Sequence, residues 1–373
     1  SVFSILQYSP LNQLNIGIIG TGDRGQGLMK IIQTIEGMKI VAICDALSFR
    51  LDQASAISPS AKRYINYLDL LSDRNLDAVI ISTPLNTHAA IASDSIDASK
   101  HIYCEKTMVK GDKDTIDLVN KVKKKHKKVF QTGHQYRSSR LYSHIRQMIQ
   151  AGEIGKVISI QAQWNRNGNW RRPVPDPKIE RQVNWRMYRE YSYGLTAELS
   201  SHQIDFCNWL LKSNPIKVAG FGGIDYWKDG RETYDNIHLV YTYPIGVKAT
   251  FTCLTSNAKD DYQIKVLGDK ATIIIGYQNA WKYPEGKYNK IFGNLDGVSG
   301  ATQSWTEGKG NPINYSHKEP TIQALEDFRK SIINNTKPES DIKSGAAVAF
   351  AVHMGIRAMD NEKVVSWDQK YTV

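Results

Sequence analysis

Short apolar runs alternate with longer amphipathic stretches in the N-terminal part of the chain, beginning at Asn15. Short apolar runs bounded by polar or glycine residues are typical of buried strands, whereas apolar residues at intervals of three and four indicate helices. The pattern predicts strands at residues 16–19, 40–44, 78–82, 102–104 and 129–131 and helices at 25–35, 86–98 and 113–124. Because strands that alternate with helices indicate βαβ units, we expect an α/β domain around a parallel sheet.

The pattern changes after Gly155 to longer strands in which apolar and polar residues alternate. Such strands are predicted at 157–164, 236–243, 248–255 and 262–267, and a turn at 267–270 leads into another at 271–275. Alternation of this kind indicates a largely antiparallel sheet with one polar face. Residues 281–314, rich in Gly, Asn and Lys, are predicted to form a loop. We therefore expect an α/β domain at 1–137 followed by an α+β domain at 138–373, built on a large, mostly antiparallel, open-faced sheet.

Composition and charge exclude some classes of protein. The 373 residues exceed the size at which one hydrophobic core usually stops growing, which favours two domains. The net charge of +11 and the basic run from Lys121 to Lys128 are open to a nucleic-acid interpretation. That run closes a predicted helix, where the helix dipole stabilises cations, so we expect a solvated helix end and no nucleic-acid partner. No apolar run approaches the roughly 20 residues that span a bilayer, so no membrane span is expected.

The cysteines and the first residue bear on metal binding and on the compartment. The four cysteines form neither a CxxC pair nor a zinc-ligand spacing, so we expect free thiols and no metal. The chain begins with Ser1 rather than Met, which is consistent with removal of a signal peptide. The bacterial cytoplasm and the periplasm both stay open, with a preference for the periplasm.

A glycine-rich loop follows the first predicted strand and opens the first predicted helix. It reads Gly20, Thr21, Gly22, Asp23, Arg24, Gly25, the GxGxxG spacing of dinucleotide-binding loops. In such loops the first glycine permits a tight turn, the second lets a pyrophosphate approach the backbone, and the third allows close helix packing. The helix N-terminus offers unpaired N–H groups to phosphate. A merely structural turn is the alternative, but the strand–loop–helix context favours a Rossmann dinucleotide site.

Asp45 indicates which dinucleotide is bound. It ends the second predicted strand, twenty residues after Gly25, where an acidic side chain accepts hydrogen bonds from the adenosine ribose hydroxyls. A carboxylate there would repel a 2′-phosphate, although Arg50 is close enough in sequence to keep NADP open. We expect NAD.

Polar residues follow the third, fourth and last predicted strands, at the carboxyl edge where open α/β sheets bind their ligands. We expect the following residues to contact the cofactor: Thr83, Pro84, Asn86, His88, Glu105, Lys106 and Gln135. Asn86 also suits a helix N-cap, a role compatible with cofactor contact.

Four motifs occur in order along the chain: the GxGxxG loop, Thr83-Pro84-x-Asn86-x-x-His88, the pair Glu105-Lys106, and Glu198-x-x-x-His202-x-x-Asp205. In their order and spacing they resemble the Gfo/Idh/MocA family of oxidoreductases, which includes glucose-fructose oxidoreductase and inositol dehydrogenase. The resemblance covers nearly the whole length. It implies a sugar or cyclitol oxidoreductase that associates through the exposed face of its second-domain sheet, as a homodimer or homotetramer.

Two positions depart from the family pattern. Thr107 stands where the family usually has the proline of Glu-Lys-Pro, so other contacts must hold the backbone bend. Glu198 stands in place of the usual aspartate, and its side chain is one methylene longer. Acid function could survive this change, but the placement of the substrate would shift.

Three residues are the candidates for catalysis: Lys106, Glu198 and His202. Oxidation of a secondary alcohol needs a base for the hydroxyl proton and stabilisation of the developing alkoxide. His202 is the expected acid/base, while Lys106 would stabilise the alkoxide and could share the proton. Glu198 and Asp205 can lie on the same helix face as His202. The alternatives are a metal site at Glu198 and His202, a structural His202, and an orienting or capping Asp205.

The residues expected at the substrate mix aromatic, amide and charged groups that suit a carbohydrate. Aromatic faces stack on sugar C–H surfaces, and amide and guanidinium groups bond hydroxyls, although arginine packed on tryptophan is also ordinary core structure. We expect these residues at the substrate: Lys106, Arg137, Trp164, Asn165, Arg166, Tyr193, Glu198, His202 and Asp205.

Three functions follow from these residues and from the resemblance. The first is NAD-dependent oxidation of a secondary hydroxyl of a sugar, glycoside or cyclitol, including oxidation to a 3-keto glycoside. The second is a redox glycosidase that oxidises its substrate, eliminates the glycosidic substituent and returns the hydride. The third is a non-catalytic NAD-binding sensor, since a fold does not prove a function. Retention of Lys106, Glu198 and His202 together argues against the third, and the first is the function that we expect.

Overall fold

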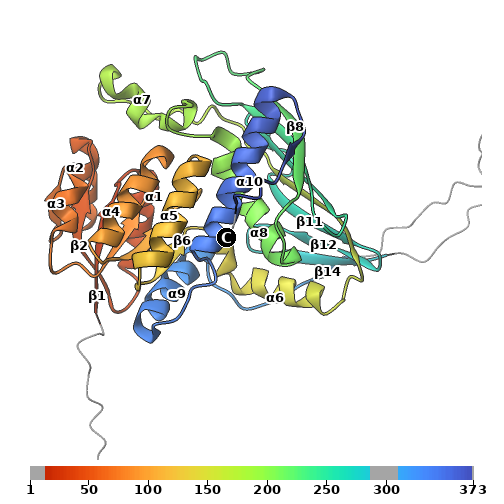
Figure 1. Ribbon diagram of the computed structural model, residues 1–373, viewed down its shortest axis with the longest axis horizontal. Helices are drawn as coiled ribbons and strands as arrows, with labels where there is room; N and C mark the ends of the chain where they lie inside the picture. The colour runs from red at the N-terminus through yellow and green to blue at the C-terminus, as the bar shows by residue number, and fades with distance from the viewer. Residues whose placement is uncertain (1–12, 286–309, 372–373) are drawn as a thin grey trace, which may run out of the picture.

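The computed structural model describes residues 13–285 and 310–371. Two β-sheets lie beside each other, the N-terminal one among the helices of the first part of the chain and the C-terminal one facing outward (Figure 1). The expected combination of an α/β part and an α+β part is confirmed.

The first sheet is six-stranded and entirely parallel. Its strands are β1 (Leu14–Ile19), β2 (Met38–Cys44), β3 (Lys62–Tyr64), β4 (Ala78–Ile81), β5 (His101–Cys104) and β6 (Phe130–Thr132), in the order β3-β2-β1-β4-β5-β6. This is the Rossmann strand order, which reverses direction between β1 and β4. The five predicted strands are all present. The pattern does not predict β3, because Lys62 and Arg63 are exposed at the edge of the sheet.

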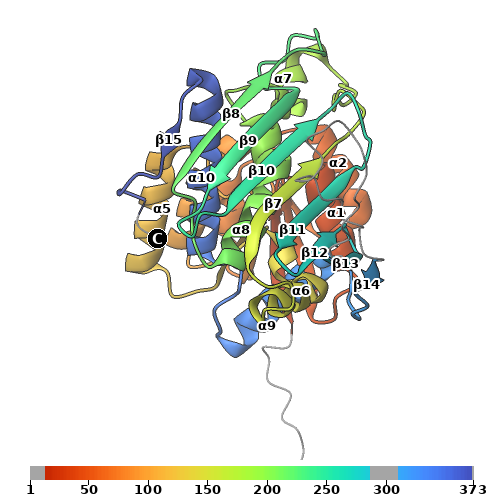
Figure 2. The same cartoon turned by 90° about the vertical axis from the view of Figure 1, so that its right-hand side faces the viewer.

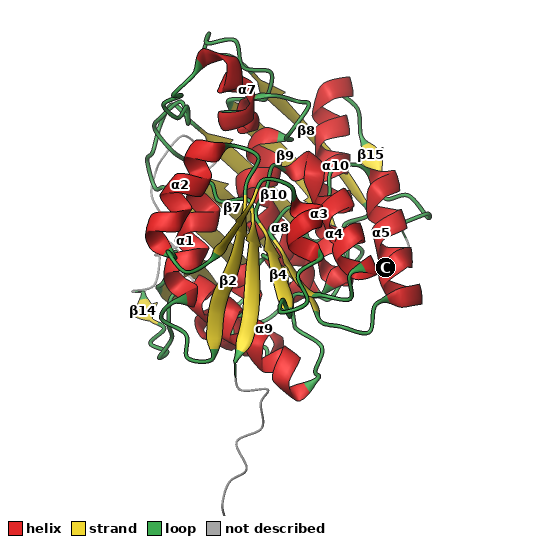
Figure 3. Ribbon diagram, turned by 90° about the vertical axis from the view of Figure 1, so that its left-hand side faces the viewer, coloured by secondary structure: helices red, strands yellow, loops and turns green. Residues whose placement is uncertain are grey.

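The helices that flank this sheet are α1 (Asp23–Ile32), α2 (Ser48–Ile57), α3 (Tyr67–Leu71), α4 (His88–Asp97) and α5 (Asp112–Lys125) (Figure 3). Helices α1, α4 and α5 correspond to the predicted helices, and the predicted start of α4 is instead a 3-10 turn at Leu85–Thr87. The pattern does not predict α2, because Leu51 and Ala54 are its buried residues and give only a narrow apolar stripe.

The second sheet is mostly antiparallel, as expected. Its strands are β7 (Val157–Trp164), β8 (Lys217–Gly223), β9 (Asn236–Thr242), β10 (Lys248–Leu254), β11 (Tyr262–Gly268), β12 (Ala271–Ile275), β13 (Ala280–Pro284), β14 (Asn311–Pro312) and β15 (Val365–Ser366). They lie in the order β14-β13-β12-β11-β7-β10-β9-β8-β15, and β7 pairs with β10 in parallel. The four longer strands that were predicted, and the strand after the turn, correspond to β7, β9, β10, β11 and β12.

The prediction of a loop at 281–314 is wrong at both ends of that range that the structure describes. β13 pairs with β12, and β14 pairs with β13, so these ends extend the sheet. The segment 280–284 lacks a regular alternation that would mark a strand, and its conformation is fixed by backbone hydrogen bonds to β12. Residues 286–309 lie outside the described part of the chain.

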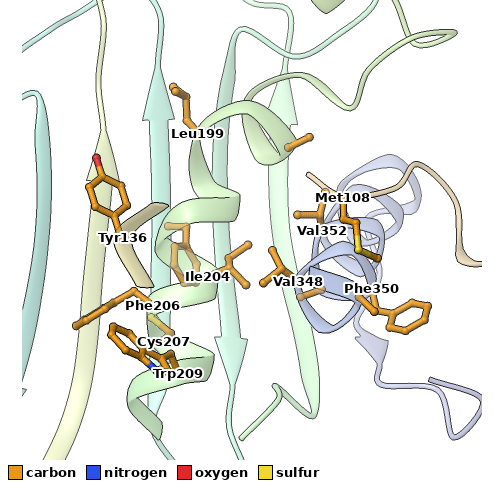
Figure 4. Close-up of a cluster of buried hydrophobic side chains, with 14 of the residues drawn as sticks. Met108, Tyr136, Leu199, Ile204, Phe206, Cys207, Trp209, Val348, Phe350 and Val352 are labelled. Atoms are coloured by element: carbon orange, nitrogen blue, oxygen red, sulfur yellow. The ribbon is translucent and has the colours of Figure 1, made fainter. Parts of the chain in front are cut away.

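The second sheet has one covered and one open face. Figure 2 shows its strands in front, with α8 (Ser201–Leu211) and α10 (Ile342–Asn361) behind them. Side chains on the open face include Phe221, Val240 and Trp281, which are exposed, whereas Leu239 and Tyr241 on either side of Val240 are buried. On the covered side, Ile204 of α8 faces Val348 and Val352 of α10 (Figure 4). This packing fixes α8, which carries His202, between the sheet and α10.

Helix α9 (Pro320–Asn334) returns to the first sheet. Its Leu325 and Phe328 share a hydrophobic cluster with Ile16 and Ile18 of β1, and the Gln131 Nε2 donates to the Ala324 carbonyl at 2.8 Å. By packing, α9 therefore belongs with the Rossmann sheet, although it lies in the range 138–373 expected for the second domain. The boundary at residue 137 stays a prediction.

Candidate cofactor and catalytic site

A cleft of about 530 Å³ opens at the carboxyl edge of the first sheet. The strand order reverses between β1 and β4, and the loops after these two strands form part of its wall, as in other doubly wound sheets. Predicted cofactor residues that line it are Gly20, Gly22, Asp23, Arg24, Asp45, Thr83, Pro84 and Asn86. The opposite wall comes from a later part of the chain: Arg172, Gln182, Val183, Trp185, Arg186 and Tyr191.

The glycine loop is held close to the loop that follows β4. Gly20 has a φ of +92°, and a Cβ there would lie 2.7 Å from the Ser82 carbonyl carbon. The Ser82 hydroxyl donates to the Gly20 carbonyl at 2.7 Å, and a Cβ on Gly25 would collide with that same carbonyl oxygen. The geometry agrees with the tight turn predicted at Gly20 and the close packing predicted at Gly25.

The N-terminus of α1 fits a phosphate group. Gly22 is the N-cap residue and contributes no side-chain cap, and the Asp23 carboxylate is turned to the Arg172 Nε at 2.7 Å. The first-turn N–H groups are therefore uncapped by these two side chains, as a phosphate site requires. A Cβ on Gly22 would meet the Arg50 guanidinium, which also lines the cleft.

Asp45 serves the loop as well as the cleft. One carboxylate oxygen accepts from the Thr21 backbone N–H at 2.7 Å and the other from the Leu47 N–H at 2.9 Å. A carboxylate has about four lone-pair sites, so acceptor capacity is left for ribose hydroxyls. Thr21 itself is buried and does not line the cleft, and its hydroxyl also donates to Asp45 at 3.3 Å.

Six predicted cofactor residues do not line the cleft: Thr21, Gly25, His88, Glu105, Lys106 and Gln135. The buried His88 ring has its Nε2 2.9 Å from the Thr83 carbonyl oxygen and its Nδ1 3.1 Å from that of Thr107, so it braces two loops from behind. Burial lowers the pKa of His88. Glu105 accepts from the Arg24 Nε at 2.7 Å, and the Gln135 Oε1 is buried without a partner among the described residues.

Lys106, Arg186 and Glu198 form a buried ionic cluster. The Lys106 Nζ donates to the Glu198 carbonyl at 2.8 Å and lies 3.8 Å from the Glu198 Oε2. The Arg186 Nε donates to the same carboxylate oxygen at 2.9 Å. The Lys106 side chain is 14% exposed and that of Glu198 is 7% exposed. The predicted association of Lys106 with Glu198 is thus present, with a second cation that joins the cluster to the cleft wall.

A π-helical turn at Thr196–Ser200 precedes α8 and carries Glu198 of the cluster. Wider turns of this kind occur often at functional sites and leave carbonyl groups free of regular helix bonds. The Thr107 hydroxyl donates to the Ala197 carbonyl at 3.1 Å, beside the bond from Lys106 to Glu198. The Lys106–Thr107 peptide is cis. At the position of the family's proline, this hydroxyl and the contact with His88 hold the loop.

The charges of the cluster are set by its surroundings. Burial raises the pKa of Glu198, but the Lys106 and Arg186 cations outweigh burial and bring the pKa below its usual value. Burial lowers the pKa of Lys106, partly opposed by Glu198. Burial, followed by repulsion from Lys106, holds the pKa of His202 well below its ordinary value. At neutral pH His202 is therefore a neutral imidazole, and Glu198 is an ionised carboxylate.

His134 and Arg186 belong to the site but were not predicted. The His134 ring is buried 5.8 Å from the His202 ring, both of its nitrogens lack partners among the described residues, and burial lowers its pKa to about 4. It follows β6 closely, so the rule that ligands bind at the carboxyl edge could have found it. Arg186 lies in a 3-10 turn, Trp185–Met187, within a segment that has no motif, and no local signal marks it.

The predicted substrate residues are divided between several places. The Trp164 ring centroid is 5.7 Å from that of His202, and the Arg166 guanidinium lies 5.4 Å from the Trp164 ring centroid, so these two lie near His202. The Asn165 amide instead donates to the Lys259 carbonyl at 3.1 Å. Tyr193 packs on His353 and under the Lys110 ammonium rather than at the cleft.

Arg137 and Asp205 form a buried ion pair. The Arg137 Nε donates to both Asp205 oxygens at 2.9 Å, and neither residue lines the cofactor cleft. The structure therefore gives Asp205 an orienting partner and places the Arg137 guanidinium on it rather than in the cleft.

Two searches of residues 13–285 and 310–371 bear on other classes of site. No three His, Cys, Asp or Glu side chains in these ranges are grouped to hold a metal ion, and all four cysteines are free and buried. In the same ranges, no helix combines the length and apolar character needed to cross a bilayer.

The fold and the cleft define a Rossmann-type dinucleotide-binding protein. A family model described as an oxidoreductase family with an NAD-binding Rossmann fold matches residues 14–134. A second model, the C-terminal domain of Gfo/Idh/MocA proteins, matches residues 142–274. Together the two models cover more than half of the chain. The chain belongs to the Gfo/Idh/MocA family, and its N-terminal part binds NAD.

Several characterised proteins are similar to this chain. Inositol 2-dehydrogenase of Salmonella typhimurium is 27% identical over 203 residues, which are 54% of this chain and 55% of that protein. The match therefore spans about half of that relative's length. The scyllo-inositol 2-dehydrogenase (NAD(+)) of Bacillus subtilis is 26% identical over 270 residues, 71% of this chain and 74% of that protein.

Solved structures share the fold at low identity. A levoglucosan dehydrogenase in complex with NADH superposes with a TM-score of 0.77 at 16% identity, over 96% of this chain and all of that chain. An aldose-aldose oxidoreductase from Caulobacter crescentus gives 0.75 at 18% identity, over 95% of this chain and 100% of that one. At these identities the likeness extends to the fold alone.

Proposed function

We propose that the protein is an NAD-dependent oxidoreductase that oxidises a secondary hydroxyl of a cyclic polyol, namely a sugar, glycoside or cyclitol. The observation that carries the proposal is the buried pair of Lys106 and Glu198, which adjoins the dinucleotide cleft through Arg186. The buried His202 lies close enough to Lys106 for that ammonium to lower its pKa. Buried charges are costly to the fold. A non-catalytic NAD sensor has no need of them at this place, so the cluster favours catalysis.

The residues of the cleft fit NAD. The uncapped first turn of α1 would bind the pyrophosphate, Asp45 would bind the adenosine ribose hydroxyls, and Thr83 and Asn86 would line the side nearer the cluster. Bound NAD⁺ supplies the hydride acceptor for the oxidation.

His202 and Lys106 would handle the proton and the charge of the substrate oxygen. The low pKa of His202 keeps its imidazole unprotonated, which is the form that accepts the hydroxyl proton. The Lys106 ammonium would stabilise negative charge on the same oxygen. Glu198 holds Lys106 in place through its carbonyl and carboxylate, and Arg186 holds Glu198.

The named activities of the relatives support the substrate class. The proteins with 26% and 27% identity act on inositols, which are rings of secondary alcohols. Trp164 and Arg166 beside His202 offer an aromatic face and a guanidinium, groups that suit a ring with several hydroxyls. The greater length of Glu198 would set the ring differently from that in enzymes with aspartate.

The test is to incubate the protein with NAD⁺ and a panel of inositols, free sugars and glycosides, and to follow NADH by absorbance. We expect NADH in proportion to keto product with at least one member of the panel. For a glycoside, release of the aglycone without net NADH would instead favour oxidation, elimination and hydride return. Absence of all three products, with NAD bound, would favour the sensor.

We also infer that the chain forms a homodimer or homotetramer through the open face of the second sheet. Exposed large apolar side chains at Phe221 and Val240 on the neighbouring strands β8 and β9, and at Trp281 on β13, support the inference, because apolar side chains on a sheet face favour association. Light scattering on the purified protein tests it: Val240→Glu should lower the mass toward that of one chain. An unchanged mass in the variant would place the interface elsewhere.

A further inference from the structure

A second pocket, of about 290 Å³, lies at the C-terminal end of α8, between α6 (Arg140–Gln150) and the start of α10. Its lining residues are Arg137, Arg146, Asn208, Trp209, Lys212, Ser213, Asn214, Lys343, Ser344 and Ala347. It shares none of them with the cofactor cleft. From His202 to Asn208 the helix rises about 9 Å, at 1.5 Å per residue, so the pocket is separate from the catalytic cluster.

Three buried hydrogen-bond donors in this lining have no acceptor. They are the Arg146 Nε, the Asn208 Nδ2 and the Trp209 Nε1, each without a partner among the described residues. The Asn208 and Trp209 side chains are each only 6% exposed. The Asn208 Oδ1 accepts from the Tyr243 hydroxyl at 2.7 Å, so this side chain lacks a partner only at its amide N–H groups. Buried donors without acceptors are costly, so this lining is suited to a ligand that brings acceptor atoms.

The lining is also strongly cationic. Four of its residues carry positive charge and none is acidic. Arg137 is neutralised by Asp205, whereas the ion pairs within residues 13–285 and 310–371 include none to Arg146, Lys212 or Lys343. The Arg146 guanidinium lies 4.6 Å from the Trp209 ring centroid. Glu339, which acts on Arg146 electrostatically, and Asp341 lie outside the lining, and Asp341 is paired with Lys337 at 2.6 Å.

We propose that this pocket binds a tetrahedral oxyanion, that is, a phosphate or sulfate group, either free or carried by a small ester. Such a group has several acceptor oxygens for the three unpaired donors and negative charge for the cations. The volume exceeds the needs of one inorganic anion, so there is room for part of an ester. This site lies beyond the proposed oxidoreductase function and does not depend on it.

The test is isothermal titration calorimetry on the full chain, at constant ionic strength set with sodium chloride. Inorganic phosphate is one titrant and glucose 6-phosphate is the other. Excess NAD is present, because the glycine loop is a competing phosphate site. We expect one anion per chain. Arg146→Gln should weaken binding roughly 10- to 100-fold, as for loss of a hydrogen bond to a charged group.

Further variants keep the proposal falsifiable. Lys343→Gln, at an exposed position on the rim, should weaken binding even where Arg146→Gln proves unstable. Lys217→Gln removes the same charge from an exposed position on β8 and should leave the affinity unchanged. Tighter binding of the ester would identify an organic phosphate as the ligand, and equal binding would identify the free anion. Absence of binding by both titrants, or equal affinity in wild type, Arg146→Gln and Lys343→Gln, would overturn the proposal.

Discussion

The glycine loop and the catalytic cluster lie in neighbouring parts of one site but differ in the chemical groups that form them. The loop is built from backbone atoms that are close in sequence, and its shape depends on the absence of side chains at Gly20 and Gly25. The cluster is built from charged side chains of distant segments, held by ion pairs and by the π-helical turn. The loop should therefore be most sensitive to substitutions that add side-chain atoms. The cluster should be most sensitive to substitutions that remove a charge.

The largest effect is expected from Lys106→Met, which removes charge while keeping most of the side-chain volume. Glu198 would keep only Arg186 of its two cations, and the substrate oxygen would lose its stabilising charge. We expect kcat/KM to fall by roughly 10²- to 10⁴-fold, with a much smaller change in NAD affinity. Steady-state kinetics and NAD titration measure the two quantities.

Lys113→Met is the matched control, because Lys113 is exposed and pairs with Asp117 on the surface. Its kinetics should equal those of the wild type. Equal losses of kcat/KM and of NAD affinity in Lys106→Met would mean that Lys106 serves cofactor binding alone, and the contrast between loop and cluster would fail.

Gly20→Ala is the corresponding test of the loop. The added Cβ would meet the Ser82 backbone at 2.7 Å, at a φ of +92°. Strain and overpacking together should cost roughly 3–5 kcal/mol of unfolding free energy. Gly111→Ala, with a φ of +97° and open space around the new Cβ, isolates the strain at about 1–3 kcal/mol. Urea unfolding of both variants gives the comparison, and equal losses would show that contact with Ser82 is unimportant.

The same contrast explains what could be predicted from sequence. The glycine loop, Asp45 and the polar ends of β4 and β5 are recognisable because each is a local pattern next to an apolar strand. Arg186 was missed because its role depends on a contact with Glu198 that no local pattern specifies. The same reason accounts for α9, which packs on β1 from the far end of the chain.

Arg137 and Tyr193 were expected at the substrate, and tertiary contacts likewise explain why neither lines the cleft. Arg137 follows the last Rossmann strand, as a cofactor or substrate ligand often does. However, α8 places Asp205 next to it, and the Arg137 Nε donates to the Asp205 carboxylate at 2.9 Å. Tyr193 is close in sequence to Glu198, yet its ring packs on His353 of α10. Residue type and chain position predicted a polar edge correctly, whereas the partner of each side chain depends on tertiary packing.

Acid sensitivity should arise at His134, next to His202, rather than at the glycine loop. Burial holds the pKa of His134 at about 4, whereas histidine in the unfolded chain titrates near 6.5. Between these values the unfolded chain binds a proton that the folded chain does not, so stability falls as the pH decreases from about 6.5 toward 4. At about pH 4.5 this loss is on the order of 2–3 kcal/mol.

His134→Gln removes this titration, so its unfolding free energy should fall less than that of the wild type between about pH 7 and pH 4.5. Denaturant unfolding at the two pH values measures the difference. His317→Gln, at a histidine that is only partly buried, should behave as the wild type. The same pH dependence in His134→Gln as in the wild type would mean that His134 is protonated in the folded protein.

The smallest effect is expected at Gly27, which lies in α1 two residues beyond the GxGxxG motif. A Cβ there would have no atom within 4 Å, and its backbone is that of an ordinary helix. Gly27→Ala should therefore raise the unfolding free energy by about 0.5–1 kcal/mol, because alanine loses less conformational entropy than glycine on folding. NAD affinity should stay unchanged. A loss of NAD binding would show that the dinucleotide approaches the backbone beyond the motif, and the part of the site that excludes side chains would then extend into the helix.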